Sequence, residues 1–416
     1  METLVYTYRF RFILLGLSFV TIFSKAQGII PLNILTPYDI RLYMPAAEDV
    51  QIQCTLEHGF RADAFDTDGH TVPLFELWQP TQSFLAAVLA NPDVLDHFSD
   101  ALKTITDDGL RGHATLTGSL QYDAALLAAR IKLPYCWWFN IFVPIYHLAR
   151  RGDFTAVPPG HSADDELVYN LLMTDIPETL NLLGLSTCSF SHTNIGDCAF
   201  SFEWMENYPQ RKPWLKNVWL DMRLGFTIPT AKKIDPVDIF ALPLGNNGST
   251  GLFFAGSVKV TLLHVGIFGA DAEFLHLFNN SEQYRIKTTR DETDFLFSAV
   301  TNILYAWGTT QRFTLSYQTS SWDGMSIYTA YQVIKHGEDT IYLDNNSYSQ
   351  AIANTAQSIQ DWTIHEWWVS LFIDSSWLLP ADSPCVPIVQ LYARIPFNGH
   401  NSMAINSAGI SIGLDF

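Results

Sequence analysis

The sequence is short of charge, and above all of positive charge. Only 16% of its 416 residues are charged, whereas charged residues make up about a quarter of an ordinary soluble domain. Lysine and arginine together number 24 against 42 aspartates and glutamates, so the formal net charge is −18. We therefore expect no nucleic-acid partner, because binding to phosphates needs clustered Lys and Arg side chains.

Signatures of catalysis and of metal binding are also missing. The sequence has no GxSxG motif, P-loop, HExxH motif or Rossmann fingerprint. Its 5 cysteines include no CxxC pair, which argues against a structural zinc site. The segments 66–69 and 107–109 contain Asp and Gly but lack the distal Glu of a calcium loop, so we interpret them as polar turns. We expect neither an enzyme nor a bound metal or cofactor.

The cysteines leave two interpretations open. Cys188 and Cys198 are close enough in sequence to form a local disulfide in an oxidising compartment. Alternatively, all the cysteines are small apolar residues that are buried or face lipid. Because the total of 5 is odd, at least one cysteine stays unpaired or pairs between chains.

The sequence also lacks a hydrophobic run that is long enough to cross a membrane as a helix. The apolar run at 12–23 follows Arg9 and Arg11, precedes Ser24-Lys25-Ala26 and is shorter than the roughly 20 residues of a membrane-spanning helix. This arrangement predicts a secretory signal peptide at residues 1–26, and hence an exported chain. Because 48% of the residues are hydrophobic, the chain must bury them in a large core or expose them to lipid from a closed barrel.

What the chain does have is a repeated alternation of apolar and polar residues. Near the start, Val50, Ile52 and Leu56 alternate with polar residues such as Gln53 and Glu57. Segments of about ten residues with this pattern, separated by turns, are typical of transmembrane β-barrels. The candidates are 50–57, 115–122, 135–147, 198–204, 218–228, 252–262, 264–277, 293–304, 312–318, 325–336, 363–375, 389–398 and 404–416. Bacterial barrels use an even number of strands, so we expect one candidate outside the wall and predict about 12 strands, with 14 as the alternative.

The last candidate strand carries the sharpest signal. Ile410, Ile412, Leu414 and Phe416 alternate with small or polar residues up to the end of the sequence. This resembles the closing strand of a bacterial outer-membrane β-barrel, whose assembly signal is a terminal Phe with apolar residues at alternate positions before it. The resemblance implies an outer-membrane location, a lipid environment, and the barrel-assembly machinery and periplasmic chaperones as partners. It also implies that this strand pairs with the first strand, near 50–60.

The predicted organisation is an all-β membrane protein. Residues 27–416 form a single closed antiparallel β-barrel domain, with partly helical insertions at 61–112 and 150–195. Within these insertions, Asn91-Pro92 is a helix start and Gly184 a helix end. The insertions are expected to act as a plug, a cap or a surface loop. The connections 229–247, 279–291 and 337–360 are expected outside, on the side opposite the chain termini.

The inner face of the barrel is the candidate functional site. A charge on the lipid face costs roughly 2–4 kcal/mol near the midplane, so charged residues within strands are expected to face inward. These residues are Glu57, Glu203, Asp221, Arg223, Lys259, Arg312, Glu366, Asp374, Arg394 and Asp415. Both signs are present, which suits either a water-filled pore or a closed, salt-bridged barrel.

Two finer expectations concern particular strands. Tryptophans near strand ends are expected in girdles at the two membrane interfaces. They are Trp137, Trp138, Trp204, Trp214, Trp307, Trp322, Trp362, Trp367, Trp368 and Trp377. A shift in the apolar pattern between Val265/Ile267 and Ala270/Phe274 indicates a β-bulge.

Three functions fit this pattern. The first is a porin-like pore for passive diffusion of small hydrophilic solutes. The second is a transporter for hydrophobic compounds that resembles the fatty-acid transporter barrels, as the helical insertion and the apolar residues on some inward faces suggest. Those barrels carry a plug before most strands, whereas this chain places a strand at 50–60 first. The third is a structural or adhesive surface protein resembling chlamydia-type major outer-membrane proteins, which cross-link through cysteines. A homo-oligomer is a further hypothesis, because porins are often trimers.

Overall fold

The computed structural model describes residues 49–416, apart from 99, 187–188, 234, 264, 323, 345–346 and 375–384. The predicted signal peptide, Cys188 and Trp377 lie outside the described residues. No helix in the described ranges is both long and apolar enough to cross a membrane.

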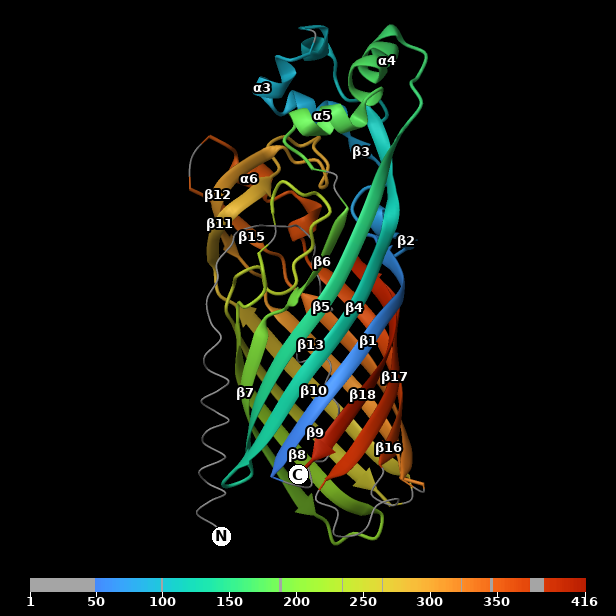
Figure 1. Ribbon diagram of the computed structural model, residues 1–416, viewed down its shortest axis with the longest axis vertical. Coiled ribbons are helices and arrows are strands. Elements are labelled where there is room, and N and C mark those ends of the chain that lie inside the picture. The colour runs from blue at the N-terminus through green and yellow to red at the C-terminus, as the bar shows by residue number, and fades with distance from the viewer. Residues whose placement is uncertain are drawn as a thin grey trace.

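Twelve antiparallel strands form a closed barrel (Figure 1). They are β1 (Val50–Phe65), β4 (His113–Leu133), β5 (Trp137–Ala156), β7 (Cys198–Pro209), β8 (Leu215–Ile228), β9 (Gly251–Leu262), β10 (Gly266–Leu277), β13 (Thr310–Thr319), β14 (Met325–His336), β16 (Trp362–Asp374), β17 (Val386–His400) and β18 (Ser402–Asp415). The barrel closes because β1 pairs with β18 on one side and with β4 on the other. The predicted count of 12 and the predicted pairing of the last strand with the first are confirmed.

One of the thirteen sequence candidates, at 293–304, overlaps β12 (Ala299–Ala306). This strand lies in a separate three-stranded sheet with β11 (Asn280–Ile286) and β15 (Thr340–Leu343). The expectation that one candidate lies outside the wall is therefore correct.

The wall alternates as a lipid-facing barrel must. On β1, Ile52 and Leu56 are 49% and 53% exposed, whereas Thr55 and Glu57 on the other face are buried. On β18, Ile410 and Ile412 are exposed, and Ser411 is buried. The buried polar side chains bond to one another across the seam, since the hydroxyl of Thr55 donates to Ser411 Oγ at 2.8 Å. The apolar residues of the seam therefore face outward and its polar residues inward.

The two ends of the barrel differ. Short turns lie at the end where β1 begins and β18 finishes, and between β4 and β5 the turn residues Tyr135 and Cys136 both have positive φ angles. Such angles match the twist of a tight hairpin. The long connections lie at the opposite end, where Figure 1 shows the helices and the small sheet stacked above the barrel.

Most of the helices at that end form a compact unit with its own core. They are α2 (Phe84–Leu89), α3 (Pro92–Leu95), α4 (Ala163–Val168) and α5 (Ile176–Leu182), with short 3-10 or π turns at Asp100–Thr104 and Tyr169–Met173. Leu85, Leu172 and Leu180 are among the residues buried in this core. The helix α6 (Gln350–Ala353) and the turn at Gln357–Ile359 pack against the small sheet instead, and the turn at Leu74–Glu76 belongs to the core at the barrel mouth. As expected, Asn91 caps α3 ahead of Pro92, and Gly184 follows α5 with a φ of +68°.

Other segments extend the wall and fill its mouth. The short strands β2 (Thr71–Pro73), β3 (Gln82–Ser83) and β6 (Phe190–Ile195) pair with β1, β4 and β5. Phe75, Phe240 and Phe295 come from three different connections and share one buried core with Tyr122 and Tyr146 on the inner faces of β4 and β5. We call this group of connections the mouth plug, because it packs against the inside of the wall.

Two sequence expectations are wrong. The register of β10 is continuous with both β9 and β13, so the predicted bulge is absent from it, and Ile267 is an apolar residue on the inner face. Trp138, Trp362 and Trp368 are buried rather than placed in a girdle. Both errors have one cause, because the interior of this barrel accepts apolar and aromatic side chains as well as polar ones.

The lipid-facing assignment of β1 predicts a depth-dependent effect of a new charge. Leu56 lies six residues after the start of β1 and Ile52 only two residues after it, on the same face. Leu56→Arg is expected to lower the unfolding free energy by about 2–4 kcal/mol, and Ile52→Arg by about 0–1 kcal/mol. Urea titration in lipid vesicles measures both. Equal effects of the two substitutions would contradict this placement of the strand in the bilayer.

Candidate functional site

The charged residues predicted to line the lumen do lie on the inner face of the wall. Glu57, Glu203, Asp221, Arg223, Glu366 and Arg394 are each at most 5% exposed. The Arg312 side chain is 11% exposed, and Lys259 and Asp374 are half-buried. The side chain of Asp415 lies outside the described part of the structure. Contacts gather most of these residues into three groups.

The first group centres on Arg394 of β17, and we call it the Arg394 cluster. Its guanidinium lies 3.3 Å from Glu57 of β1 and 3.3 Å from Glu366 of β16. The hydroxyls of Tyr392 and Ser407 donate to Glu57 at 2.7 and 2.6 Å. Both carboxylates therefore share one cation and bridge four neighbouring strands of the seam.

Glu366 is also held from the other side. The Gln332 amide of β14 donates to its Oε1 at 2.9 Å, and the Trp368 indole donates to the same oxygen at 2.8 Å. The guanidinium of Arg394 lies 4.9 Å from the centre of the Trp368 ring, within range of a cation–π interaction. Neutral donors and an aromatic face thus supplement the ion pairs of this buried cluster.

The second group, the Arg312 cluster, lies on β8, β10 and β13. Arg312 contacts Glu273 at 2.8 Å, and Arg223 approaches the same carboxylate oxygen at 3.7 Å. Arg223 also lies 3.9 Å from Asp221. One carboxylate on β10 therefore sits between two arginines from different strands.

The third group, the Arg130 cluster, lies on β4, β5 and β7. Arg130 contacts Glu203 at 3.0 Å, and the Asn140 amide donates to the same oxygen at 2.9 Å. Asn140 also accepts from Arg130 at 3.1 Å. The guanidinium lies 4.9 Å from the centre of the Trp138 ring. This arrangement repeats the design of the Arg394 cluster, with an arginine set against both a glutamate and an indole.

Aromatic side chains occupy the interior between these clusters. The buried group includes Phe142, Phe253, Tyr328, Trp368, Phe372 and Tyr392. A small cavity lies between the Arg312 cluster and these aromatic rings, and its lining includes Arg223, Asp271, Arg312, Tyr328 and Phe372. Its volume is about 30 Å³, which is enough to hold an ordered water molecule. Near this cavity the interior is occupied by the buried side chains of the Arg312 cluster and of the aromatic group.

Above the clusters, polar contacts hold the mouth plug in place. Asp197, just before β7, accepts the backbone N–H groups of Ala231 and Asn246 at 2.9 and 2.5 Å. The Asn247 amide lies 3.2 and 3.3 Å from the two carboxylate oxygens of Glu282 on β11. Burial raises the pKa of Glu282 to about 7, against the opposing effects of Lys233 and of the Asn247 amide. These bonds tie the 229–250 connection to the barrel rim and to the small sheet.

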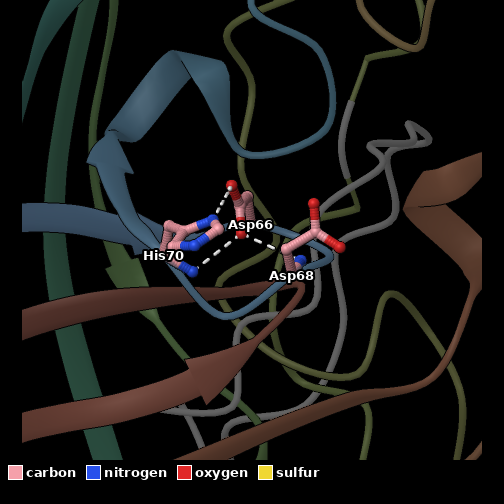
Figure 2. Close-up of side chains that lie close together, drawn as sticks. All are labelled: Asp66, Asp68 and His70. Atoms are coloured by element: carbon pink, nitrogen blue, oxygen red, sulfur yellow. Dashed lines mark hydrogen bonds and ion pairs between the residues drawn. The ribbon is translucent and has the colours of Figure 1, made fainter.

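A cluster of possible metal ligands lies at the tip of β1. Figure 2 shows Asp66, Asp68 and His70, whose ligand atoms lie within 4.8 Å of one another. The Oδ1 atom of Asp66 accepts the backbone N–H groups of Asp68 and His70 at 2.9 and 2.8 Å. The contacts of Asp66 are those of a hydrogen-bonded polar turn, which is the interpretation that the sequence favoured.

Sequence reasoning missed several members of the clusters. Arg130 lies in the part of β4 beyond the predicted segment 115–122, although it continues the same alternation down to Leu133. Glu273 was hidden by the wrongly predicted bulge, because an uninterrupted alternation places it on the inner face. Trp368 was assigned to a girdle although it shares the face of Glu366. A consistent period of two along the full strand finds Glu273 and Trp368. It does not find Arg130, which shares the face of the apolar residues Leu116 and Tyr122, so the rule that apolar residues face lipid would have turned it outward.

The predicted disulfide stays a prediction, because Cys188 lies outside the described residues. Its proposed partner, Cys198, is half-buried and accepts a hydrogen bond from the Thr230 hydroxyl at 3.4 Å.

Comparison with solved structures finds outer-membrane channels. A channel from Pseudomonas putida F1 is similar over 90% of this chain and 98% of its own, with 10% identity and a TM-score of 0.50. A deletion mutant of TodX, a monoaromatic hydrocarbon channel, is 10% identical over 89% of this chain and 91% of its own, with a TM-score of 0.35. A FadL homologue from Pseudomonas aeruginosa is 7% identical over 88% of each chain, with a TM-score of 0.28.

The match to the Pseudomonas putida channel establishes the fold. The chain therefore has the fold of a bacterial outer-membrane β-barrel protein, as its terminal strand indicated. No protein-family model and no curated protein matches the sequence.

The Arg394 cluster predicts a large loss of stability when its cation is removed. Arg394→Met leaves Glu57 and Glu366 buried without their cation, and we expect the unfolding free energy to fall by about 3–5 kcal/mol. Combining it with Glu57→Gln and Glu366→Gln is expected to restore most of the loss. Arg61→Met, which breaks an exposed pair with Asp63, is the control and is expected to cost at most about 1 kcal/mol. Urea unfolding in detergent compares the variants, and an Arg394→Met protein as stable as the wild type would contradict the assignment.

The raised pKa of Glu282 predicts that the mouth plug loosens as the pH rises. The folded state holds this proton up to a pH of about 7, whereas the unfolded chain releases it near 4.5. The contribution of Glu282 to stability is therefore full below 4.5 and is lost as the pH rises through 7. We expect the amide hydrogens of β11 and β12 to be less protected from exchange at pH 8 than at pH 5.5, after correction for the pH dependence of the intrinsic exchange rate. The Glu282→Gln variant should show no such difference, and a pH-independent wild type would contradict the interpretation.

Proposed function

We propose that the protein is an outer-membrane channel for small solutes, and that the resting conformation described above is closed. The observation that carries the proposal is the content of the barrel interior. Three arginine–carboxylate clusters and a set of aromatic rings fill it from several strands, and the mouth plug covers the end with the long connections. A barrel kept only for stability has no need of this many buried ionic groups, because apolar residues of similar size fill a core at lower cost.

The mixed lining indicates the kind of solute. Tyr328, Trp368 and Phe372 offer apolar faces, while Arg223 and Arg312 offer donors across the small cavity. A solute with an apolar body and one polar group can use both sides at once. Hydrated ions and sugars gain less from such a lining, so we favour small amphipathic compounds over the purely hydrophilic solutes of a general porin.

Passage through the barrel requires the mouth plug to move. Its aromatic side chains come from three separate connections. The 229–250 connection is held by hydrogen bonds at Asp197 and Glu282, and the connection that carries Phe75 pairs with the wall only through the short strands β2 and β3. Segments of this kind open at lower free energy than the barrel wall does. We therefore assign gating to the plug and selection of the solute to the interior.

A general pore for hydrophilic solutes is the second candidate. Inward charges of both signs favour it, because they create a transverse field across a water-filled lumen. In this alternative the arginine clusters move to the walls in the conducting state. Conductance measurements distinguish the two candidates, since a general pore gives large and steady current steps in the wild type, without any substitution of the interior residues.

The test uses two adjacent tryptophans of β16 that face opposite sides of the wall. Trp368 lies inside and is buried, whereas Trp367 is 44% exposed on the lipid side. In planar bilayers we expect the wild type to show low, infrequent conductance and Trp368→Ala to raise it. Trp367→Ala should behave as the wild type does.

Two outcomes contradict this account of the channel. The absence of current steps from the wild type and from Trp368→Ala at every voltage argues against a channel of any kind. Large steady steps that are identical in all three proteins argue for an open general pore instead.

A further inference from the structure

Arg150 is a buried cation that the clusters of the interior do not include. It lies on the inner face of β5, after Tyr146 and Leu148 on the same face, and is 1% exposed. None of its three guanidinium nitrogens has a hydrogen-bond partner among the described residues. By contrast, Arg130, Arg312 and Arg394 each contact a carboxylate. Arg150 therefore departs from the rule that the other interior arginines follow.

Three phenyl rings surround the guanidinium. Its central carbon lies 4.4 Å from the centre of the Phe75 ring, 5.2 Å from that of Phe295 and 5.9 Å from that of Phe240. Such contacts attract a cation weakly, but they offer no acceptor for its five N–H groups. Asp238 acts on Arg150 electrostatically, yet its Oδ1 atom accepts the N–H of Phe240 at 2.9 Å. An acceptor for the fork of Arg150 is missing from its described surroundings.

We propose that Arg150 binds the carboxylate of a small organic anion that has an apolar body. A guanidinium fork matches a carboxylate through two parallel hydrogen bonds, and a dry surrounding strengthens them. The residues around Arg150 are apolar and aromatic, so they suit the body of such a ligand and not a hydrated inorganic anion. The inference rests on the proposed channel function and narrows its substrate class.

The three rings are the parts that must leave for the ligand to bind. Phe75, Phe240 and Phe295 all belong to connections of the mouth plug and not to wall strands, whereas Arg150 is fixed on β5. Displacement of the plug therefore uncovers Arg150 at the mouth of the barrel. The apolar body of the ligand then takes the place of the departing rings.

Gly152 shows how closely one ring fits over this site. A Cβ atom at Gly152 would lie 2.6 Å from two atoms of the Phe240 ring, closer than real contacts allow. Gly152→Ala therefore forces the Phe240 ring away from its position near Arg150, while Arg150 itself is unchanged. If the rings cover a ligand site, this substitution should speed binding.

The test is calorimetric titration of the purified full-length protein in detergent with 3-phenylpropanoate, 3-phenylpropanamide and acetate. We expect the wild type to bind 3-phenylpropanoate about tenfold or more tightly than the amide, because charge-assisted hydrogen bonds to the guanidinium are lost with the carboxylate. Acetate, which lacks the apolar body, should bind more weakly than 3-phenylpropanoate. Arg150→Met should remove the preference for the acid and, because it deletes an unpaired buried charge, should still fold.

Arg151 provides the matched control. It is the next residue on β5 and is exposed on the other face, so Arg151→Met removes the same charge without touching the site. Arg151→Met should retain the tenfold preference for the acid over the amide. Gly152→Ala should retain the same preference and reach binding equilibrium faster. Equal binding of the acid and the amide by the wild type, or an unchanged preference in Arg150→Met, would overturn the inference. Tight binding of acetate would overturn the assigned ligand class.

These outcomes are separable from those of the channel test. A protein without current steps in bilayers contradicts the proposed function, but it leaves the binding difference between wild type and Arg150→Met measurable. A channel that conducts and binds the amide as well as the acid contradicts only the role of Arg150.

Discussion

A charge enclosed in the barrel interior must meet a partner of opposite sign, and most of this structure depends on that constraint. Removal of an ion from water costs several kcal/mol unless an opposite charge and further hydrogen bonds replace the solvent. Arg394 satisfies it with Glu57 and Glu366, and Arg312 satisfies it with Glu273. The lipid outside allows no alternative placement, because the outward faces of the same strands are apolar. Lipid on one side and a packed interior on the other thus determine the positions of the charged residues in the three clusters.

The same pairing of charges determines how a solute can pass through the interior. Clusters that link several strands hold the wall together and close the lumen at the same time, so a solute can pass only by replacing some of these contacts. Aromatic rings beside each arginine cluster supply apolar surface where the ion pairs leave space. Two buried charges differ from this background. Both carboxylate oxygens of Asp271 lack a hydrogen-bond partner among the described residues, and phenyl rings of the mouth plug surround Arg150 instead of a carboxylate. An interior that pairs its other arginines and leaves one without an acceptor has a natural place for an anion from outside.

Much of the barrel could be predicted from the sequence, because a period of two is a local property of each strand. The alternation in β1 and β18 identified the seam, and the even-number rule predicted that one candidate lies outside the wall but not that this candidate is the segment of β12. The errors arose where the inner face departs from a polar lumen. Ile267 inside β10 was mistaken for a change of phase, which hid Glu273, and Trp138 and Trp368 were assigned to the membrane interface. The clusters themselves could not be predicted, because Glu57 and Arg394 are far apart in sequence and meet only when the barrel closes. The sequence did not indicate that Arg150 lacks a hydrogen-bond acceptor, because its surroundings are formed by loops that fold into the barrel mouth.

The closed interior is the central claim, and thiol labelling measures it most directly. In a background with the native cysteines replaced, Ser257→Cys places a thiol on the inner face of β9, where the serine is 6% exposed, and Leu110→Cys places one on an exposed connection. A charged methanethiosulfonate reagent added to intact outer-membrane vesicles should label the Leu110→Cys thiol rapidly. The Ser257→Cys thiol should react far more slowly than the Leu110→Cys thiol. Its labelling rate should rise when Gly152→Ala is added, because that substitution disturbs the plug. Rapid labelling of Ser257→Cys with the plug intact would mean an open aqueous lumen and would contradict the account.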